Sequence, residues 1–462
     1  MLKAELPAPG ASIAERIARA VHACDPATHP QALPVARRLV LDIVGLCVAA
    51  RAEPYVQAAL ASIDQDGPCA VIGHDACLGV EGAAFVNGTA AHGEDFDDTY
   101  EGGPVHAGAV IMPAVLAAAQ RHGASGADLL RGIAVGVELT CRLCAVAPTR
   151  VHKAGFHPTA IFGVMGAVAG IGAMLRVADK AMVDALGIAG SLAGGIIEYL
   201  SEGAWTKRLH PGWAAQSGYR AVRLAQGGFV GPRTVFEGPH GFFHGFANTV
   251  DGDFEAMLEG FGAQWIWTTI AFKPYACGTM AHPYIDCARA FRRQGIALER
   301  IRSIECETAE GIVHRLWEPL AAKQAPASAY AAKFSIPYAI AVGLTDDDAG
   351  LAQYTDARVA DPALRALAAK VRYVVDPANP YPRQFTGHVR VTLDDGSVLE
   401  HRQGHFKGGV EHPLSDEDLL HKFRANCAVG GLDGLATARL LERLDRLFAL
   451  PQITSDALSA RL

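Results

Sequence analysis

The chain has few aromatic residues, no long run of basic residues and no paired framework of cysteines. Phe, Trp and Tyr make up 7% of its 462 residues, too few to line the aromatic cavity in which an enzyme stabilises carbocations. The formal net charge of −7 argues against a nucleic acid as the main partner. The ten cysteines are scattered and are expected to be reduced, buried thiols. A small anionic substrate is compatible with this composition, because a few local cations suffice to bind it.

Two common kinds of cofactor site are also missing. No glycine-rich loop follows a strand and opens a helix, so the sequence predicts neither a dinucleotide-binding fingerprint nor a phosphate-binding P-loop. Cys141 and Cys144 form a C-x-x-C pair that has no matching second pair. A zinc ribbon or an iron–sulfur cluster is therefore not expected.

The sequence gives no sign of export or of a membrane span. The first residues, MLKAELPAPGASIAERIARAV, lack a continuous apolar segment and a small-residue cleavage site, which predicts no signal peptide and a cytoplasmic location. The most apolar stretch, residues 161–175, is shorter than the roughly 18 to 20 residues that a span requires, and we interpret it as a buried helix. Gly166 and Gly170 lie four residues apart within it, a spacing that lets neighbouring helices approach closely.

What the chain has in abundance is helical periodicity. From Ile13 to about Gly260, apolar residues recur every three or four positions, with caps or breakers between the runs. The predicted helices are 33–50, 79–93, 107–122, 125–147 with Ser125 as N-cap, 159–175, 180–193 and 212–226. The first half of the chain is therefore expected to be an all-helical domain.

Short β-branched or aromatic runs begin after about Trp265. Strands are predicted at 265–272, 301–308 and 371–375, with a hairpin at 388–401 that turns through Asp-Gly. Helices are predicted at about 279–293 and 329–344, and again from Asp416 onward. The fold class is thus mainly α: a large all-helical domain, residues 1–265 with 406–462 packing back onto it, and a smaller inserted α+β lid domain, residues 266–405.

The segment with the clearest chemical signature is Asp95-Phe96-Asp97-Asp98-Thr99, which a glycine-rich turn separates from His106. Carboxylates this close repel one another, so at least one pKa should rise unless cations, hydrogen bonds or water compensate. Such crowding is typical of reactive sites. A simpler interpretation makes Asp97 or Asp98 a helix cap and leaves the others solvated. The nearby histidine favours chemistry, because its ordinary pKa lies close to working pH.

Four other segments place polar groups beside glycine or proline where one element ends and another begins. They contain His157 (GFHPT), Lys207 (KRLHPG), Lys273 (FKPYACG) and Tyr338 (KFSIPY). His157 and Lys207 each precede an apolar helix, whose start attracts anions. Each residue alone has a structural explanation as a cap, a surface cation or a core side chain. Together they suit a substrate with two or three carboxylates.

These segments give the chain a resemblance to the MmgE/PrpD family, which includes 2-methylcitrate dehydratase, cis-aconitate decarboxylase and iminodisuccinate epimerase. The resemblance rests on NGTAAHGEDFDDT (87–99), VHAGAVIMPA (105–114), GFHPTAIFG (155–163), ALGIAGSLAGG (185–195) and KRLHPGWAA (207–215), with weaker support from FKPYACGTMAHPYID (272–286) and AKFSIPYAIA (332–341). It implies a homodimer, a helical domain made from both chain ends, an inserted lid and an active site in the cleft between them. It implies neither a metal nor an organic cofactor.

The resemblance also implies roles for individual residues. Seven positions match the family's active site: Asp95, Thr99, His106, His157, Lys207, Lys273 and, more loosely, Tyr338. The shared chemical step is proton exchange at a carbon next to a carboxylate, with His106 as general acid and base and Asp95 orienting its ring. Lys207, Lys273 and His157 are expected to bind substrate carboxylates, and Thr99 and Tyr338 to add hydrogen bonds.

The sequence departs from the decarboxylase branch of the family in the active-site segments. The turn before His106 is one residue longer, Ala107 stands where proline is common, and Gly278 stands where that branch has a histidine, for which His282 is a candidate substitute. The glycine weighs against cis-aconitate decarboxylation, and the expected activity is dehydration of a small tricarboxylate such as 2-methylcitrate, the activity by which the family is usually labelled. Alternatives are an epimerase of an iminodisuccinate-like dicarboxylate, a cis-aconitate decarboxylase, a binding protein without catalytic activity, and a class II terpene cyclase that uses DFDD as proton donor.

Overall fold

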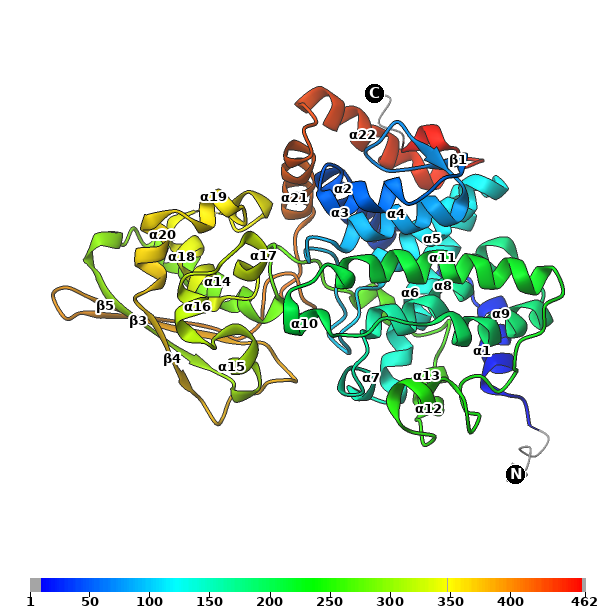
Figure 1. The fold of residues 1–462 in the computed structure, drawn as a ribbon, viewed down its shortest axis with the longest axis horizontal. Helices are drawn as coiled ribbons and strands as arrows, with labels where there is room; N and C mark the ends of the chain where they lie inside the picture. The colour runs from blue at the N-terminus through cyan, green and yellow to red at the C-terminus, as the bar shows by residue number, and fades with distance from the viewer. Residues whose placement is uncertain (1–9, 347, 459–462) are drawn as a thin grey trace. The chain divides into compact units, whose positions relative to one another are not determined.

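The computed structural model describes residues 10–346 and 348–458. The first nine residues, on which the signal-peptide prediction partly rests, lie outside the described residues. The protein is 58% helical with 9% strand, which confirms the mainly α class. The chain divides into two compact units (Figure 1): Met1–Gly93, Asp97–Ile270 and Asn426–Leu462 form the first, and Glu94–Phe96 with Ala271–Ala425 form the second.

The core of the first unit consists of long helices that pack against one another. They are α4 (Val80–His92), α5 (Ala107–His122), α6 (Gly126–Val146), α8 (Pro158–Leu175) and α11 (Thr206–Gln226). The other helices of this unit are α1 (Ile13–Ala23), α2 (Ala32–Ala50), α3 (Pro54–Ala61), α7 (Arg150–Lys153), α9 (Asp179–Leu192), α10 (Tyr199–Glu202), α12 (Phe242–Ala247), α13 (Phe254–Leu258) and α22 (Gly434–Arg446). Ser125 caps α6 through a reciprocal capping box with Asp128, as predicted.

Glycines allow α6 and α8 to pack closely. A Cβ atom at Gly166 would lie 2.6 Å from the carbonyl oxygen of Gly136, and one at Gly170 would lie 2.6 Å from that of Gly132. The predicted close helix approach is confirmed. With 18 residues, α8 is longer than expected and is apolar enough to cross a membrane, so the argument from its length was wrong. However, 94% of it is buried inside the protein, as in the core helix of a soluble protein.

Three local predictions for the first unit were wrong. The unit is not all-helical, because β1 (Asp66–Ala70) and β2 (Cys77–Leu78) form a small antiparallel sheet. Residues 265–272 are not a strand but contain a 3₁₀ helix, Ile266–Thr269, where the backbone N–H of Trp267 donates to Glu138 of α6 at 2.9 Å. Helix α11 begins at Thr206 instead of Gly212, since Gly212 provides close packing against α4 and does not break the helix: its Cβ would lie 2.1 Å from the Phe85 carbonyl oxygen.

A four-stranded sheet organises the second unit. Its order is β4 (Val371–Val375), β3 (Ile301–Thr308), β5 (Gly387–Leu393) and β6 (Val398–Gln403), with β3 parallel to β4 and antiparallel to β5. All four strands were predicted. One face packs against α14 (His282–Arg293), which contacts α18 (Ile336–Thr345). The remaining helices are α15 (Glu310–Leu316), α16 (Leu320–Gln324), α17 (Ala329–Ala332), α19 (Asp356–Val359) and α20 (Pro362–Ala368). Helix α21 (Asp416–Val429) begins in this unit and ends in the first, which resumes at Asn426.

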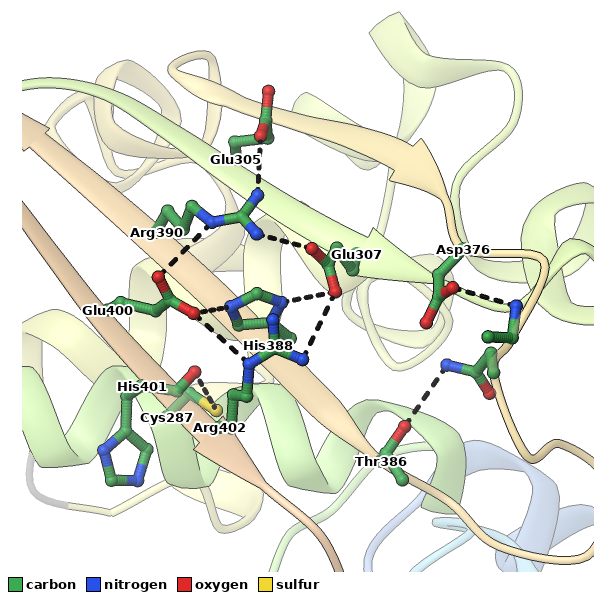
Figure 2. A network of polar contacts seen from close by, with 12 residues as sticks. Cys287, Glu305, Glu307, Asp376, Thr386, His388, Arg390, Glu400, His401 and Arg402 are labelled. Carbon is green, nitrogen blue, oxygen red and sulfur yellow. Dashed lines mark hydrogen bonds and ion pairs between the residues drawn. The ribbon is translucent and has the colours of Figure 1, made fainter.

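The opposite face of this sheet carries a network of charges (Figure 2). His388 lies between Glu307 and Glu400, with its two ring nitrogens 2.6 and 2.7 Å from their carboxylate oxygens. Arg390 pairs with Glu305 and Glu307 at 3.1 and 2.6 Å. Burial raises the pKa of Glu307, but the bonds from His388 and Arg390 outweigh it and leave that pKa lowered. Cross-strand ion pairs thus hold the polar face of the sheet together.

Candidate functional site

The acidic segment lies in the connection between α4 and α5, and it is shared between the two units. Residues 94–96 belong to the second unit and Asp97 onward to the first. Asp98 matches one part of the simpler expectation, because its carboxylate accepts the backbone N–H of Gly108 in the first turn of α5 at 3.0 Å, although the N-cap residue itself is His106. Gly108 is required there, since its Cβ would lie 2.3 Å from the same carboxylate. The other part, that the remaining aspartates are solvated, was wrong, since Asp95 and Asp97 are buried.

His106 is held at the start of α5 in one tautomer. Its ring Nδ1 lies 2.8 Å from the carbonyl oxygen of Asp98, and its backbone N–H donates to Thr159 Oγ1 at 3.1 Å. Because a carbonyl oxygen only accepts, Nδ1 carries the hydrogen. The other ring nitrogen, Nε2, therefore has the lone pair. The side chain is 13% exposed, so this nitrogen belongs to a partly accessible ring that can take up a proton.

A carboxylate oxygen of Asp97 lies beside the His106 ring, in the place where the family resemblance implies Asp95. Asp97 Oδ1 lies 3.5 Å from His106 Nδ1, and its other oxygen lies 2.7 Å from Nδ1 of His92, the last residue of α4. The side chains of Asp97 and His92 are fully buried. Both histidines thus face the same carboxylate.

His157 and His210 add two further imidazoles to this part of the first unit. Their Nδ1 atoms are 3.1 Å apart, so one donates to the other. Burial, followed by the nearby His92, Lys207, His210 and His106, holds the pKa of His157 well below its usual range. Burial beside His92 and Lys207 lowers the pKa of His210 to about 4. Both rings are therefore neutral at pH 7, and His157 offers a hydrogen bond and not a charge.

In the second unit, three buried lysines bind the backbone of residues 94–96. Lys333 donates to the Glu94 carbonyl oxygen at 2.7 Å, Lys273 to that of Asp95 at 2.8 Å, and Lys422 to that of Phe96 at 2.6 Å. Lys273 also pairs with the Asp95 carboxylate at 3.1 Å. Asp95 has a left-handed backbone with φ 54°, a strained conformation that these contacts compensate.

The remaining candidates of the second unit are held by internal hydrogen bonds. The Tyr338 hydroxyl donates to the Gln353 carbonyl oxygen at 2.7 Å. His282 Nε2 lies 3.2 Å from the Cys277 carbonyl oxygen, and burial beside Lys273 lowers the pKa of this histidine to about 3. Gly278 has room for a side chain, because the nearest atom to an added Cβ is 3.7 Å away.

The structure brings the predicted residues together in two groups. His106 and His157 share the first unit, with ring centres 6.5 Å apart, and Lys207 influences His157 from the first turn of α11. Half-buried Thr99 follows Asp98 in this unit. Asp95 and Lys273 form an ion pair in the second unit. Sequence reasoning did not single out His92, Asp97 as the neighbour of His106, His210, Lys333 or Lys422. His92 and Asp97 lie in the motif AHGEDFDD and His210 lies in KRLHPG. Nothing in the helical pattern around Lys422 distinguishes that residue.

His92, Asp97 and His106 place ligand-type atoms within 4.8 Å of one another, a spacing that a metal ion could use. Hydrogen bonding explains this spacing. His92 Nδ1 donates to the Asp97 carboxylate and His106 Nδ1 donates to the Asp98 carbonyl oxygen. Each of these Nδ1 atoms then carries a hydrogen, so only the Nε2 atoms of the two rings keep a lone pair that can bind a proton or a metal.

Comparison with known proteins covers both units. Residues 15–255 match the MmgE/PrpD N-terminal domain, and residues 275–442 match the MmgE/PrpD C-terminal domain. The chain is 30% identical over 455 residues to a cis-aconitate decarboxylase of Aspergillus terreus, which covers 91% of this chain and 89% of that protein. It is 31% identical over 358 residues to the cis-aconitate decarboxylase of Mus musculus, covering 75% and 71%, and 30% identical over 357 residues to that of Homo sapiens, covering 75% and 72%.

Proposed function

The chain belongs to the MmgE/PrpD family, and on that premise we propose that it is a cofactor-independent lyase that dehydrates a small tricarboxylate such as 2-methylcitrate. The observation that carries the proposal is the tautomer of His106. Its Nδ1 hydrogen is engaged by Asp98, which leaves Nε2 as a base for a proton on the carbon next to a carboxylate. Asp97, 3.5 Å from Nδ1, stabilises the positive ring that results.

In this mechanism His106 carries one proton from the substrate carbon to the departing hydroxide. His106 Nε2 takes the proton from the carbon beside a carboxylate, and a carbon–carbon double bond forms as the hydroxyl on the neighbouring carbon departs. The imidazolium then gives its proton to the departing hydroxide, which leaves as water. Negative charge that develops on the substrate carboxylate is stabilised by a cation, the role we assign to Lys207, and by hydrogen bonds, to which His157 contributes. Thr99, in the same unit as His106, is proposed to complete substrate binding.

Decarboxylation of cis-aconitate is the second candidate, and the decarboxylases to which the chain is similar favour it. In that reaction the carbon–carbon bond to a carboxylate breaks, carbon dioxide leaves, and the carbanion-like carbon accepts a proton. The His106 imidazolium would donate that proton. Gly278 weighs against this reaction, since the decarboxylase branch has a histidine at the matching position. An epimerase reaction would use only the proton removal and return at His106.

The test is proton NMR in D₂O with chelator-treated protein and 2-methylcitrate, citrate, cis-aconitate and iminodisuccinate. One experiment separates elimination, loss of carbon dioxide and deuterium exchange. We expect elimination from a tricarboxylate and a fall of about 100-fold or more in His106→Ala. His244→Ala, which changes an exposed histidine of the same unit, should retain full activity. Undiminished turnover in His106→Ala would exclude the proposed role of this residue.

A further inference from the structure

The groups that face Nδ1 of His106 affect how readily its other ring nitrogen, Nε2, takes up a proton. His106 Nδ1 faces two oxygens, the Asp98 carbonyl oxygen at 2.8 Å and Asp97 Oδ1 at 3.5 Å. The carbonyl fixes the tautomer but has no net charge. Of these two groups, the Asp97 carboxylate is the one with a negative charge that can compensate the charge the ring gains when Nε2 takes a proton.

Asp97 is itself held in place by His92. Its second oxygen lies 2.7 Å from His92 Nδ1, and neither side chain is accessible to solvent. His92 is the last residue of α4, and the rings of His92 and His106 have their centres 4.9 Å apart. A buried carboxylate without a donor on this oxygen would lose a strong hydrogen bond. The donor from α4 therefore determines where the carboxylate stands relative to His106.

We propose that His92 and Asp97 are positioning residues for the base, in which His92 fixes the Asp97 carboxylate and Asp97 stabilises the His106 imidazolium. This inference rests on the proposed function and deepens it. The arrangement differs from a simple helix cap because Asp98, not Asp97, caps α5. It also differs from the sequence-based expectation that Asp95, the partner of Lys273, orients the ring.

The charged and titratable groups around His106 come from several elements. The loop contributes Asp97 and Asp98, α4 contributes His92, and the N-terminus of α8 contributes His157, whose ring centre is 6.5 Å from that of His106. Lys207 on α11 acts on His157. Among these groups, Asp97 places a carboxylate oxygen 3.5 Å from Nδ1, so its removal should make His106 a weaker base.

Three variants test the two roles. Asp97→Asn keeps the shape and removes the charge. His92→Leu removes the donor, and His92→Asn restores one, because its side-chain N–H reaches the position of Nδ1. We expect Asp97→Asn and His92→Leu to lower kcat roughly 10- to 100-fold with KM changed less than about threefold. The acidic limb of the kcat profile should move to lower pH by about one unit in Asp97→Asn. His92→Asn should recover most of the loss.

Nitrogen-15 NMR of histidine-labelled protein provides a readout that does not depend on turnover. The wild-type protein should show His106 in its Nδ1-protonated tautomer, and Asp97→Asn should lower the pH at which this ring titrates. His122→Leu, which changes an exposed histidine on α5, serves as control and should alter neither. If no polycarboxylate is turned over but the ring behaves as described, the proposed function fails and the positioning role stands. An Nε2-protonated His106 in the wild type, an unchanged titration in Asp97→Asn, or equal losses in His92→Asn and His92→Leu would overturn the inference.

Discussion

Lys422 and Phe96 are joined twice: the Lys422 ammonium donates to the Phe96 carbonyl oxygen at 2.6 Å and lies 3.8 Å from the centre of the Phe96 ring. A second bond from the same ammonium, 2.9 Å long, reaches the carbonyl oxygen of Lys273. One cation thus ties the acidic segment to the residue that binds Asp95. This contact is 326 residues distant in sequence, and it satisfies two buried carbonyl groups at once.

Replacing Lys422 by methionine should therefore destabilise the second unit. Methionine fills most of the volume but leaves two carbonyl oxygens without their donor, at a cost of about 1 to 3 kcal/mol each, and it removes the contact of the ammonium with the ring. Part of this cost is offset because a buried ammonium is no longer desolvated. We expect a net loss of about 2 to 4 kcal/mol in the free energy of unfolding, measured with chemical denaturant, and faster hydrogen exchange at residues 94–98.

Lys407→Met is the matched control, since it removes the same charge from the same unit. Lys407 pairs with Asp418 at 2.7 Å while 25% of its side chain remains exposed, so the loss should stay below about 1 kcal/mol. Equal effects of the two substitutions would mean that Lys422 contributes charge alone and does not hold the acidic segment.

Two glycines provide a contrasting pair for the packing argument. Gly170→Ala places a Cβ 2.6 Å from the Gly132 carbonyl oxygen between α8 and α6, and backbone atoms cannot move aside cheaply. We expect a loss of about 1 to 3 kcal/mol. Gly278→Ala meets no atom nearer than 3.7 Å, and φ is −59°, which alanine adopts readily. Its thermal unfolding midpoint should stay the same or rise slightly. A Gly170→Ala protein as stable as the wild type would show that the two helices can separate.

The helices and strands that were predicted correctly have residues that mark where the element begins and where it ends. The prediction of 107–122 coincides with α5, because polar residues precede it and Gly123 ends it with a left-handed φ of 65°. The hairpin of β5 and β6 was recognised from its Asp-Gly turn. The failures arise from tertiary contacts. Residues 265–272 have a strand-like composition, yet the Glu138 carboxylate of α6 binds the backbone N–H of Trp267, and no local pattern announces this partner.

In the candidate site, too, local sequence features were recognised and partners set by tertiary contacts were not. His106 and the acidic segment stand out because unusual residue types crowd a short stretch of chain. Which aspartate faces which histidine is decided by the path of the loop, and the left-handed φ of Asp95 was not visible in the sequence. The pairing of His157 with His210 depends on the packing of α8 against α11. Sequence spacing alone identified the residue types but not their partners.

Two exposed tryptophans lead to a prediction about assembly. Trp205, the N-cap residue of α11, and Trp213 within that helix are 51% and 44% exposed, and Ile196 and Leu200, which precede the helix in sequence, are exposed by more than half. Large apolar side chains that gather on a surface are typical of contact sites. With the homodimer implied by the family resemblance, we expect sedimentation to give a dimer that Trp213→Asp weakens at least tenfold in dissociation constant. Phe229→Asp, an exposed aromatic residue beyond the end of α11, should leave the dimer intact; a wild-type monomer would contradict the prediction.

The buried pair of His157 and His210 predicts that acid weakens the fold. The pKa of His210 is lowered to about 4 by burial and by nearby cations, whereas an unfolded chain titrates near 6.5. Between these values the unfolded state binds more protons, so the stabilising effect of the neutral ring is complete above about pH 6.5 and is lost as pH falls toward 4. For His210 alone this amounts to about 3 kcal/mol, and His157, whose pKa is also lowered, adds to it.

The free energy of unfolding, measured with denaturant at pH 7.5, 6 and 5, should fall steadily. His210→Gln cannot be protonated and should flatten this decline, whereas His244→Gln, an exposed change, should reproduce the wild-type slope. A decline that is as steep in His210→Gln as in the wild type would locate the acid sensitivity elsewhere in the chain.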